Sequence, residues 1–139
     1  MSLNINRISP SKVIRGEKAW EKSIDSITKL CKKPLIVGRS LSTKKFRNTF
    51  ERDLLSKGIK VMSFDLSHDC CELDVKDVCK FSKKHNCDGI IAAGGGKVLD
   101  AGKLIADLLS INCIAVPLSA STCAGWTALS NIYTTDGKF

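Results

Sequence analysis

The chain has 139 residues, enough for one compact domain with a continuous core but too few for two ordinary domains. Its hydrophobic content of 43% and charged content of 26% are typical of a folded globular protein and exclude a disordered chain. No apolar run approaches the ~18 residues of a membrane span, and the amino terminus has no signal-peptide core. The cytoplasm is therefore the expected compartment.

The formal net charge of +8 raises the alternative of a basic nucleic-acid-binding protein. Against it, the lysine pairs at 32–33, 44–45 and 83–84 fall at the ends or beginnings of predicted helices and alternate with acidic residues. Aromatic residues do not interleave with these lysine pairs as a platform for base stacking would require. Nucleic-acid binding is therefore the less favoured interpretation.

Strand-like apolar runs alternate along the chain with helix-like spacings of three and four, which is the pattern of an α/β fold with a parallel sheet covered on both faces. In the first half we expect a short strand at 12–15, a helix over 17–32 that Pro34 ends, a strand at 35–37, a helix from a Ser42 or Thr43 N-cap to Gly58, and a strand at 59–64. The positions expected to face the core on these two helices are Trp20, Ile24, Ile27, Cys31, Phe46, Phe50 and Leu54.

The second half continues the alternation. We expect a helix from Asp74, a buried strand at 90–93, a helix over 98–109, a buried strand at 111–116 that Pro117 ends, a strand at 128–134 and a hairpin turn at 135–137. The core-facing positions on the two helices are Val75, Val78, Cys79, Ser82, Ala101, Ile105 and Leu108. Only two residues follow the turn, so we expect the chain to be truncated within this hairpin.

Three consecutive glycines, Gly94, Gly95 and Gly96, follow the 90–93 strand. Without a Cβ, their backbone is expected to turn with positive φ and to bring N–H groups against an anion, while the next helix directs its N-terminal dipole at the same spot. Lys97 adds a positive charge. The run is neither a dinucleotide fingerprint nor a P-loop, because Val98 follows the lysine. The alternative is a tight strand-to-helix turn with an exposed lysine.

A second loop supports the anion-binding interpretation. Residues 118–122 follow the 111–116 strand, and the carboxyl ends of parallel strands lie at one edge of the sheet. The two loops are therefore expected to meet over one crevice. The sequence predicts a pyrophosphate site there.

The chain has seven cysteines, an odd number that favours reduced thiols over a disulfide framework. A zinc site is the alternative for the nearby cysteines and histidines. No Cys-x-x-Cys pair is present, and the candidate ligands lie on both sides of a predicted helix. The group comprises His68, Cys70, Cys71, Cys79, His85 and Cys87.

Three ordered segments carry a family resemblance over about Ser9 to Phe139. Residues 94–100 are similar to a Gly-Gly-Gly-Lys-Thr-Leu-Asp run, residues 117–122 to a Pro-Thr-x-Ala-Ser-Thr run, and residues 128–137 to an Ala-Leu-Ser-Val-Ile-Tyr-Thr-Glu-Asp-Gly run. The chain thus resembles the glycerol dehydrogenase branch of the iron-containing alcohol dehydrogenase family.

The resemblance implies that residues 1–139 form a single NAD(P)-binding domain. Its fold would be a Rossmann-like parallel sheet, as in the amino-terminal domain of dehydroquinate synthases, and it would belong to a metal-dependent polyol or alcohol dehydrogenase. We expect the helical domain that binds zinc or iron in the family to be absent from this sequence, and His68 and His85 match none of its ligands. We assign no catalytic and no metal-binding residue, and expect the isolated chain to be inactive. A catalytically silent nucleotide-binding remnant is the alternative.

The resemblance also implies cofactor-binding positions. Gly94 to Val98 would hold the pyrophosphate, Leu118 and Ser121 would border the adenine and ribose, and the nicotinamide side would be lined by Thr127, Leu129 and Tyr133. Alternatively, the leucine and tyrosine are core residues and the serine and threonine are turn residues. Asp100 is interpreted as a helix-start charge rather than a ligand.

Two positions depart from the family. Cys123 stands where the family has an aspartate near the polyol, which implies a less polar substrate side or simply a small buried residue. Arg39 stands where an aspartate often bonds the ribose hydroxyls, which would favour a 2′-phosphate and hence NADP, unless it is an ordinary exposed arginine.

The implied partners are NAD or NADP and a small polyol or alcohol, with no membrane. The expected 128–133 strand would have an unpaired edge, and apolar surface beside the crevice would also be exposed. We therefore expect homo-oligomer formation through that edge.

Overall fold

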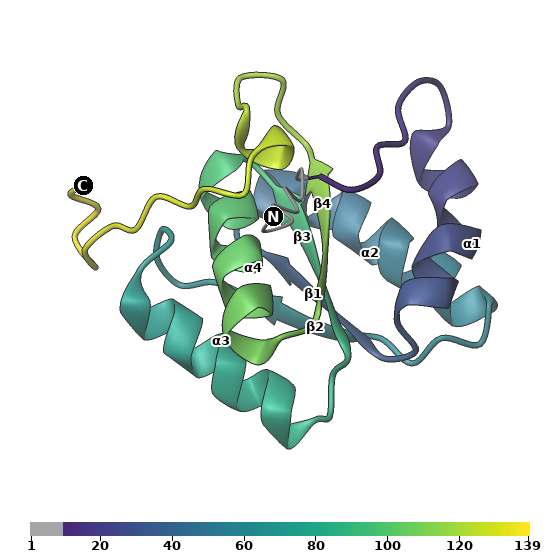
Figure 1. Cartoon of the computed structure of the whole chain (residues 1–139), viewed down its shortest axis with the longest axis horizontal. Coiled ribbons are helices and arrows are strands. Elements are labelled where there is room, and N and C mark those ends of the chain that lie inside the picture. Colours follow the sequence, from purple (N-terminus) through teal and green to yellow (C-terminus); the bar gives the residue numbers. More distant parts are fainter. Residues whose placement is uncertain (1–9) are drawn as a thin grey trace, which may run out of the picture.

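The computed structural model of the chain describes residues 10–139, in which helices and strands alternate (Figure 1). The elements are α1 (Ala19–Leu30), β1 (Pro34–Gly38), α2 (Leu41–Ser56), β2 (Met62–Asp65), α3 (Glu72–Lys84), β3 (Gly89–Gly94), α4 (Gly96–Leu109), β4 (Asn112–Pro117) and the short 3-10 helix η1 (Ala124–Trp126). The strands form one parallel sheet in the order β2-β1-β3-β4. Within the described part of the chain, no helix has the length and apolar character that a membrane crossing requires.

Helices cover both faces of the sheet, as the sequence predicts. Side chains of successive strand residues point to opposite faces, so Leu35 and Val37 pack against α3 and α4 while Ile36 packs against α1 and α2. Ile90 and Ile91 divide in the same way between the two faces. The fold is therefore a three-layer α/β sandwich, and the predicted fold class is confirmed.

The end of α2 is a Schellman motif. Gly58 follows the helix with a φ of 77°, its N–H donates to the carbonyl of Leu55 at 2.9 Å, and the N–H of Ile59 donates to the carbonyl of Leu54 at 3.2 Å. Glycine at this C′ position was expected. The start differs, because Ser40 is the N-cap and its Oγ accepts from the N–H of Ser42 at 3.2 Å.

Two predicted core-facing positions are exposed. Phe46 on α2 is 44% exposed, and the neighbouring Arg47 is buried in its place. On α4, Leu108 is 59% exposed whereas Ile105 is fully buried, and in the last turn the neighbouring Leu109 packs against the core instead.

The expected strands at both ends of the chain do not form. Residues 12–15 have no regular secondary structure. Residues 128–134 make only a single parallel bridge, between Tyr133 and Cys71, because the N–H of Tyr133 donates to the carbonyl of Cys70 at 2.6 Å. The predicted turn is present, with a 2.9 Å bond from the N–H of Gly137 to the carbonyl of Thr134.

The edge strands of the described sheet are β2 and β4, and residues 128–133 form no strand, so the expectation that this segment provides an unpaired strand edge is wrong. β4 pairs with β3 alone, and Asn112 and Cys113 are exposed. The prediction of a buried strand at 111–116 is therefore wrong in its burial, because a strand at the edge has a neighbour on one side only.

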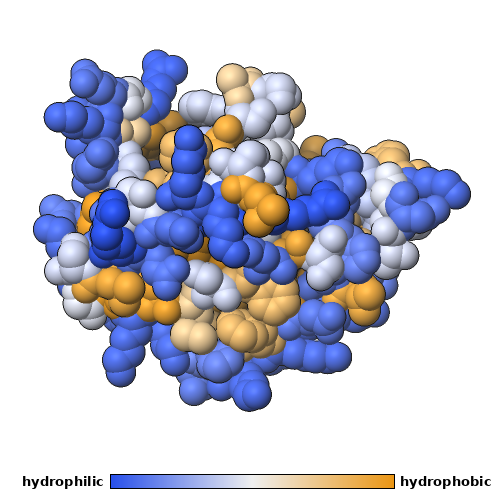
Figure 2. All heavy atoms as spheres, turned by 180° about the vertical axis from the view of Figure 1, so that it is seen from behind, coloured by the Kyte–Doolittle hydropathy of each residue, from blue (hydrophilic) through white to orange (hydrophobic). Residues whose placement is uncertain are grey.

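Figure 2 shows the back of the molecule, where hydrophilic side chains are spread between several apolar patches. Many basic side chains are paired with carboxylates from their own helix or from a neighbouring strand. Examples are Lys44 with Asp65, Lys76 with Glu72 and Lys80 with Asp77. The net positive charge is thus interspersed with acids, as the sequence suggested.

Ile105 and Leu108, two aliphatic residues of α4 with opposite exposure, give a matched test of how this helix packs. We expect Ile105→Ala to lower the free energy of unfolding by about 2–5 kcal/mol, since it leaves a cavity between α4 and the sheet. Leu108→Ala is expected to cost less than about 1 kcal/mol, because its side chain is largely in water. Urea unfolding followed by circular dichroism measures both. Equal losses would contradict the orientation of α4.

Candidate nucleotide-binding site

The loops that follow β3 and β4 meet at the carboxyl end of the sheet. Gly94 lies in register with Pro117, and the N–H of Leu118 donates to the carbonyl of Gly94 at 2.9 Å. The expectation that the two loops share one crevice is confirmed. A cavity of about 420 Å³ opens there, lined by Gly96, Lys97, Asp100, Ser121, Thr122, Cys123, Ala124, Thr127, Leu129, Asn131 and Tyr133.

Close contacts, rather than positive φ, explain the glycines. Among the described residues, the glycines with positive φ are Gly16, Gly58 and Gly137, so the expected left-handed turn at 94–96 is wrong. Instead, a Cβ on Gly94 would lie 2.9 Å from the Cβ of Val98, and one on Gly96 would lie 2.7 Å from Oγ1 of Thr122. A side chain at Gly94 would therefore displace the first turn of α4, and one at Gly96 would push away the loop after β4.

Gly95 is different, because a Cβ there would meet nothing within 4 Å. It is the N-cap of α4 and has no side chain to accept from the first N–H groups of the helix. The carbonyl of Gly95 accepts from Val98 and Leu99 at 3.0 and 3.1 Å, as in any first helical turn. The N–H groups at the start of α4 are thus left without a side-chain cap beside open space, which is the geometry that binds phosphate.

Some of the predicted cofactor residues line the cavity and others do not. The cavity is lined by Gly96, Lys97, Ser121, Thr127, Leu129 and Tyr133, and also by the substrate-side candidate Cys123. Gly94, the last residue of β3, and Gly95, the N-cap of α4, directly precede the lining residue Gly96. Three others lie outside the lining: Val98 is buried beneath Gly94, Leu118 packs with the α1–α2 side of the core, and Arg39 follows β1.

Burial separates some of the alternatives. Leu129 is 79% exposed, so it is not a core residue, whereas Tyr133 is half-buried and packs against the α3–α4 side of the core. Ser121 takes part in a local turn, since its Oγ lies 2.8 Å from that of Ser119. Cys123 is exposed, not a small buried residue.

Lys103 holds the cavity wall together, and sequence reasoning missed it. Its Nζ donates to the carbonyls of Ala124 and Thr127 at 2.8 and 3.1 Å and also to that of Leu129. It pairs with Asp100 at 3.0 Å, and its side chain is only 13% exposed. One ammonium group thereby gathers the chain from η1 to residue 129 against α4.

Asp100 extends the same wall. One carboxylate oxygen accepts from the N–H of Asn131 at 3.3 Å, and its carbonyl accepts from the Oγ of Ser130 at 3.0 Å. Because α4 begins at Gly96, Asp100 lies past the first turn and is buried, so its interpretation as a helix-start charge is wrong. The i, i+3 spacing with Lys103 was the signal available in the sequence.

Arg39 and Lys97 share one carboxylate. The guanidinium of Arg39 donates to one oxygen of Asp69, and the Nζ of Lys97 lies 2.6 Å from the other. The Nζ of Lys97 also lies 4.7 Å from the centre of the Tyr133 ring, within range of a cation–π interaction. The ends of β1 and β3 are therefore linked through the loop between β2 and α3.

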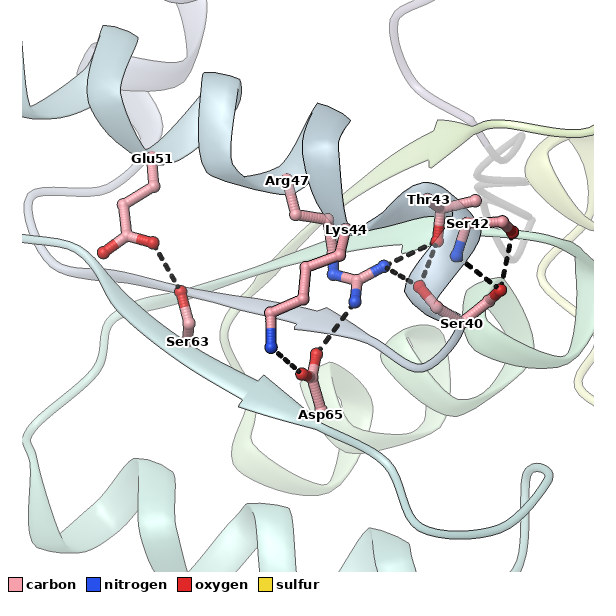
Figure 3. Close-up of polar contacts among 8 residues, drawn as sticks. All are labelled: Ser40, Ser42, Thr43, Lys44, Arg47, Glu51, Ser63 and Asp65. Carbon is pink, nitrogen blue, oxygen red and sulfur yellow. Dashed lines mark hydrogen bonds and ion pairs between the residues drawn. The ribbon is translucent and has the colours of Figure 1, made fainter.

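The buried Arg47 supports the turn that carries Arg39 (Figure 3). Its guanidinium donates to the carbonyl of Ser40 at 3.2 Å, to Oγ1 of Thr43 at 2.6 Å and to Asp65 at 2.9 Å. The side chain covers Gly38, where a Cβ would overlap it. The turn between β1 and α2 is thereby fixed by an arginine whose role the sequence pattern did not predict.

Of the residues considered as alternative zinc ligands, His68 and Cys71 lie together beside Asp74. Their donor atoms and those of Asp74 all lie within 4.8 Å of one another. Asp74 accepts from the N–H of His68 and faces its Nδ1, both at 2.7 Å. Burial raises the pKa of Asp74, but these hydrogen bonds outweigh it and hold that pKa below its usual value. The carboxylate of Asp74 is therefore already used in hydrogen bonds to His68, which lies in the loop before α3.

The family metal finds no matching ligand set at the cavity. Among residues 10–139, the lining includes one carboxylate, that of Asp100, and no histidine. Asp100 already pairs with Lys103 and accepts from Asn131. These residues do not fit a zinc or iron ion. The cysteines are free thiols, and burial raises the pKa of Cys31 and of Cys70 to about 11.

Comparison with known proteins agrees with this arrangement. A profile of the family described as iron-containing alcohol dehydrogenase matches residues 10–139. An uncharacterized oxidoreductase of Synechocystis sp. is 34% identical in sequence to this chain. The alignment covers 95% of this chain and 34% of that protein. A glycerol dehydrogenase of Escherichia coli is 28% identical over 94% of this chain and 36% of that protein. The crystal structure of glycerol dehydrogenase from Schizosaccharomyces pombe is 27% identical, with a TM-score of 0.72 over 86% of this chain and 30% of that one. The chain spans about a third of the length of the curated relatives.

The wall built on Lys103 gives a second test. Lys103→Met keeps the aliphatic stem but leaves Asp100 buried without its cation, so we expect a loss of about 3–5 kcal/mol in the free energy of unfolding. Amide hydrogen exchange should accelerate over residues 124–131.

Lys80→Met is the matched control, because Lys80 forms an i, i+3 pair with Asp77 on the exposed side of α3. It is expected to change the free energy of unfolding by less than about 1 kcal/mol. Similar effects of the two variants would show that Lys103 does not organise the cavity wall.

Proposed function

Because the chain belongs to the iron-containing alcohol dehydrogenase family, we propose that residues 1–139 form the NAD(P)-binding domain of a glycerol dehydrogenase-like enzyme. The observation that carries the proposal is the junction at the carboxyl end of the sheet. There the uncapped start of α4 opens into a cavity closed on its other side by the loop after β4. This arrangement suits a ligand with a pyrophosphate and two flanking rings.

In this proposal the N–H groups of Gly95 to Lys97 hold the pyrophosphate, with the Lys97 ammonium beside it. Gly94 and Val98 allow the close approach of strand and helix. Leu118 and Ser121 border the adenine and ribose, and the nicotinamide side is formed by Thr127, Leu129 and Tyr133. Arg39, at the end of β1, lies on the ribose side and would take the 2′-phosphate of NADP.

The proposed whole-enzyme reaction is the transfer of a hydride between the nicotinamide and a small polyol or alcohol. Cys123 lines the cavity and would face the substrate with a thiol in place of the family's aspartate. We assign no catalytic residue to this chain, and any zinc or iron would be held by residues other than those that line the cavity. The cytoplasm is the proposed compartment.

Cofactor binding can be tested through Cys123. Saturating NAD or NADP should slow the alkylation of Cys123 by iodoacetamide, because the bound cofactor covers the cavity that this exposed thiol lines. Mass spectrometry of the digested protein measures the rate at each cysteine. Cys31 and Cys70 serve as internal controls, since they are buried and their raised pKa keeps them as thiols in either state.

Gly95→Val is the matched variant for this experiment. The added side chain meets no protein atom within 4 Å of its Cβ but takes up the space beside the first N–H groups of α4. We expect the affinity for both cofactors to fall at least about tenfold while the free energy of unfolding changes by less than about 1 kcal/mol. Unprotected Cys123 in the unmodified chain at saturating cofactor would contradict the proposal.

A further inference from the structure

The carboxylate of Asp69 forms ion pairs with both Arg39 and Lys97, the two cations that are proposed to bind the phosphates of the cofactor. Its side chain is only 13% exposed, while those of Arg39 and Lys97 are 43% and 48% exposed. The cations come from different strand exits, β1 and β3, and both reach toward the loop between β2 and α3. Among the described residues, neither cation has an ion pair with any other carboxylate.

The carboxylate is the fixed member of this group. Cys70 and Cys71, which follow Asp69, are almost fully buried, and the carbonyl of Cys70 accepts from the N–H of Tyr133. On the other side, the backbone of His68 is held by Asp74. The lysine and arginine end long flexible stems that are half in solvent. Any change of partner would therefore move the cations and leave Asp69 in place.

A phosphate group competes directly with such a carboxylate. Guanidinium and ammonium groups bind both kinds of oxygen anion, and arginine binds phosphate in a two-point geometry. We propose that Asp69 is a specificity-determining residue that competes with the 2′-phosphate of NADP for Arg39. In the proposed function Lys97 would lie beside the pyrophosphate that NAD and NADP share, so its release would affect both cofactors alike. This inference rests on the proposed function and adds Asp69 to it.

Asp69→Asn tests the competition, because the amide has the shape of the carboxylate without its charge. Dissociation constants for NAD and NADP are measured by isothermal titration calorimetry on the full 139-residue chain, after circular dichroism has shown that each variant is folded. We expect both cofactors to bind more tightly. NADP should gain about tenfold more than NAD, the value of one charge-assisted hydrogen bond.

Two controls identify the partner. In an Arg39→Gln background, Asp69→Asn should tighten both cofactors equally and leave their affinity ratio unchanged. Glu72→Gln removes a negative charge three residues after Asp69, but this exposed carboxylate pairs with Lys76 instead, so the variant should also leave the ratio unchanged. A ratio that shifts equally in Glu72→Gln would reduce the effect to net charge and overturn the inference.

The remaining outcomes separate the two proposals. If the unmodified chain binds neither cofactor, the proposed function is wrong and the inference is wrong with it. If the chain binds cofactor but Asp69→Asn leaves the NADP to NAD ratio unchanged or lowers it, the proposed function stands and the role of Asp69 is contradicted.

Discussion

Two side chains leave no room for a Cβ where β3 becomes α4, and this steric constraint shapes the whole site. Val98 packs beneath Gly94, and Thr122 packs against Gly96. Because Gly94 and Gly96 have no side chains, α4 can begin immediately after β3. The loop after β4 can also approach closely, and the N–H of Leu118 donates to the carbonyl of Gly94. The helix start and the second loop thus enclose one cavity. A larger residue at 94 would displace the first turn of α4, and a larger residue at 96 would displace the second loop.

Charged groups then fix what the backbone has brought together. Lys103 binds three carbonyls and Asp100, and so holds an irregular segment in place without a strand or a helix. Arg47 fixes the turn after β1 in a comparable way. Asp69 differs, since its two partners are half-exposed and lie where a ligand's phosphates are proposed to bind. Buried cations give this site its shape, and half-exposed ones are available for binding.

The features that follow from local spacing were predictable from the sequence. The alternation of elements, the glycine C′ cap at Gly58 and the meeting of the loops after β3 and β4 all depend on residues close in sequence or on the rule that parallel strands end together. The 128–134 segment was not predictable, because its apolar alternation suits a strand but its hydrogen-bond partners are set by tertiary contacts. Tyr133 bonds to Cys70, and Asp100 holds the neighbouring residues.

The buried charges show a second limit of sequence patterns. Hydrophobic periodicity places Phe46 inward, yet Arg47 is buried because Gly38 leaves space for its stem and Asp65 neutralises it. The same periodicity gives no weight to Asp100 and Lys103, whose spacing on α4 is the only local sign that they pair. Hydrophobic periodicity does not show the distant contacts of these charges either, since Arg47 pairs with Asp65 and Lys103 donates to the carbonyls of Ala124 and Thr127.

The central claim is that the exits of β3 and β4 form one nucleotide site. The most direct test is a titration of the ¹⁵N-labelled chain with NAD and NADP, followed by two-dimensional NMR of the backbone amides. The account predicts that the largest shifts fall on the amides of residues 95–97 and 121–127, with Arg39 responding to NADP more than to NAD. Shifts confined to other surfaces, or none at saturating cofactor, would contradict it.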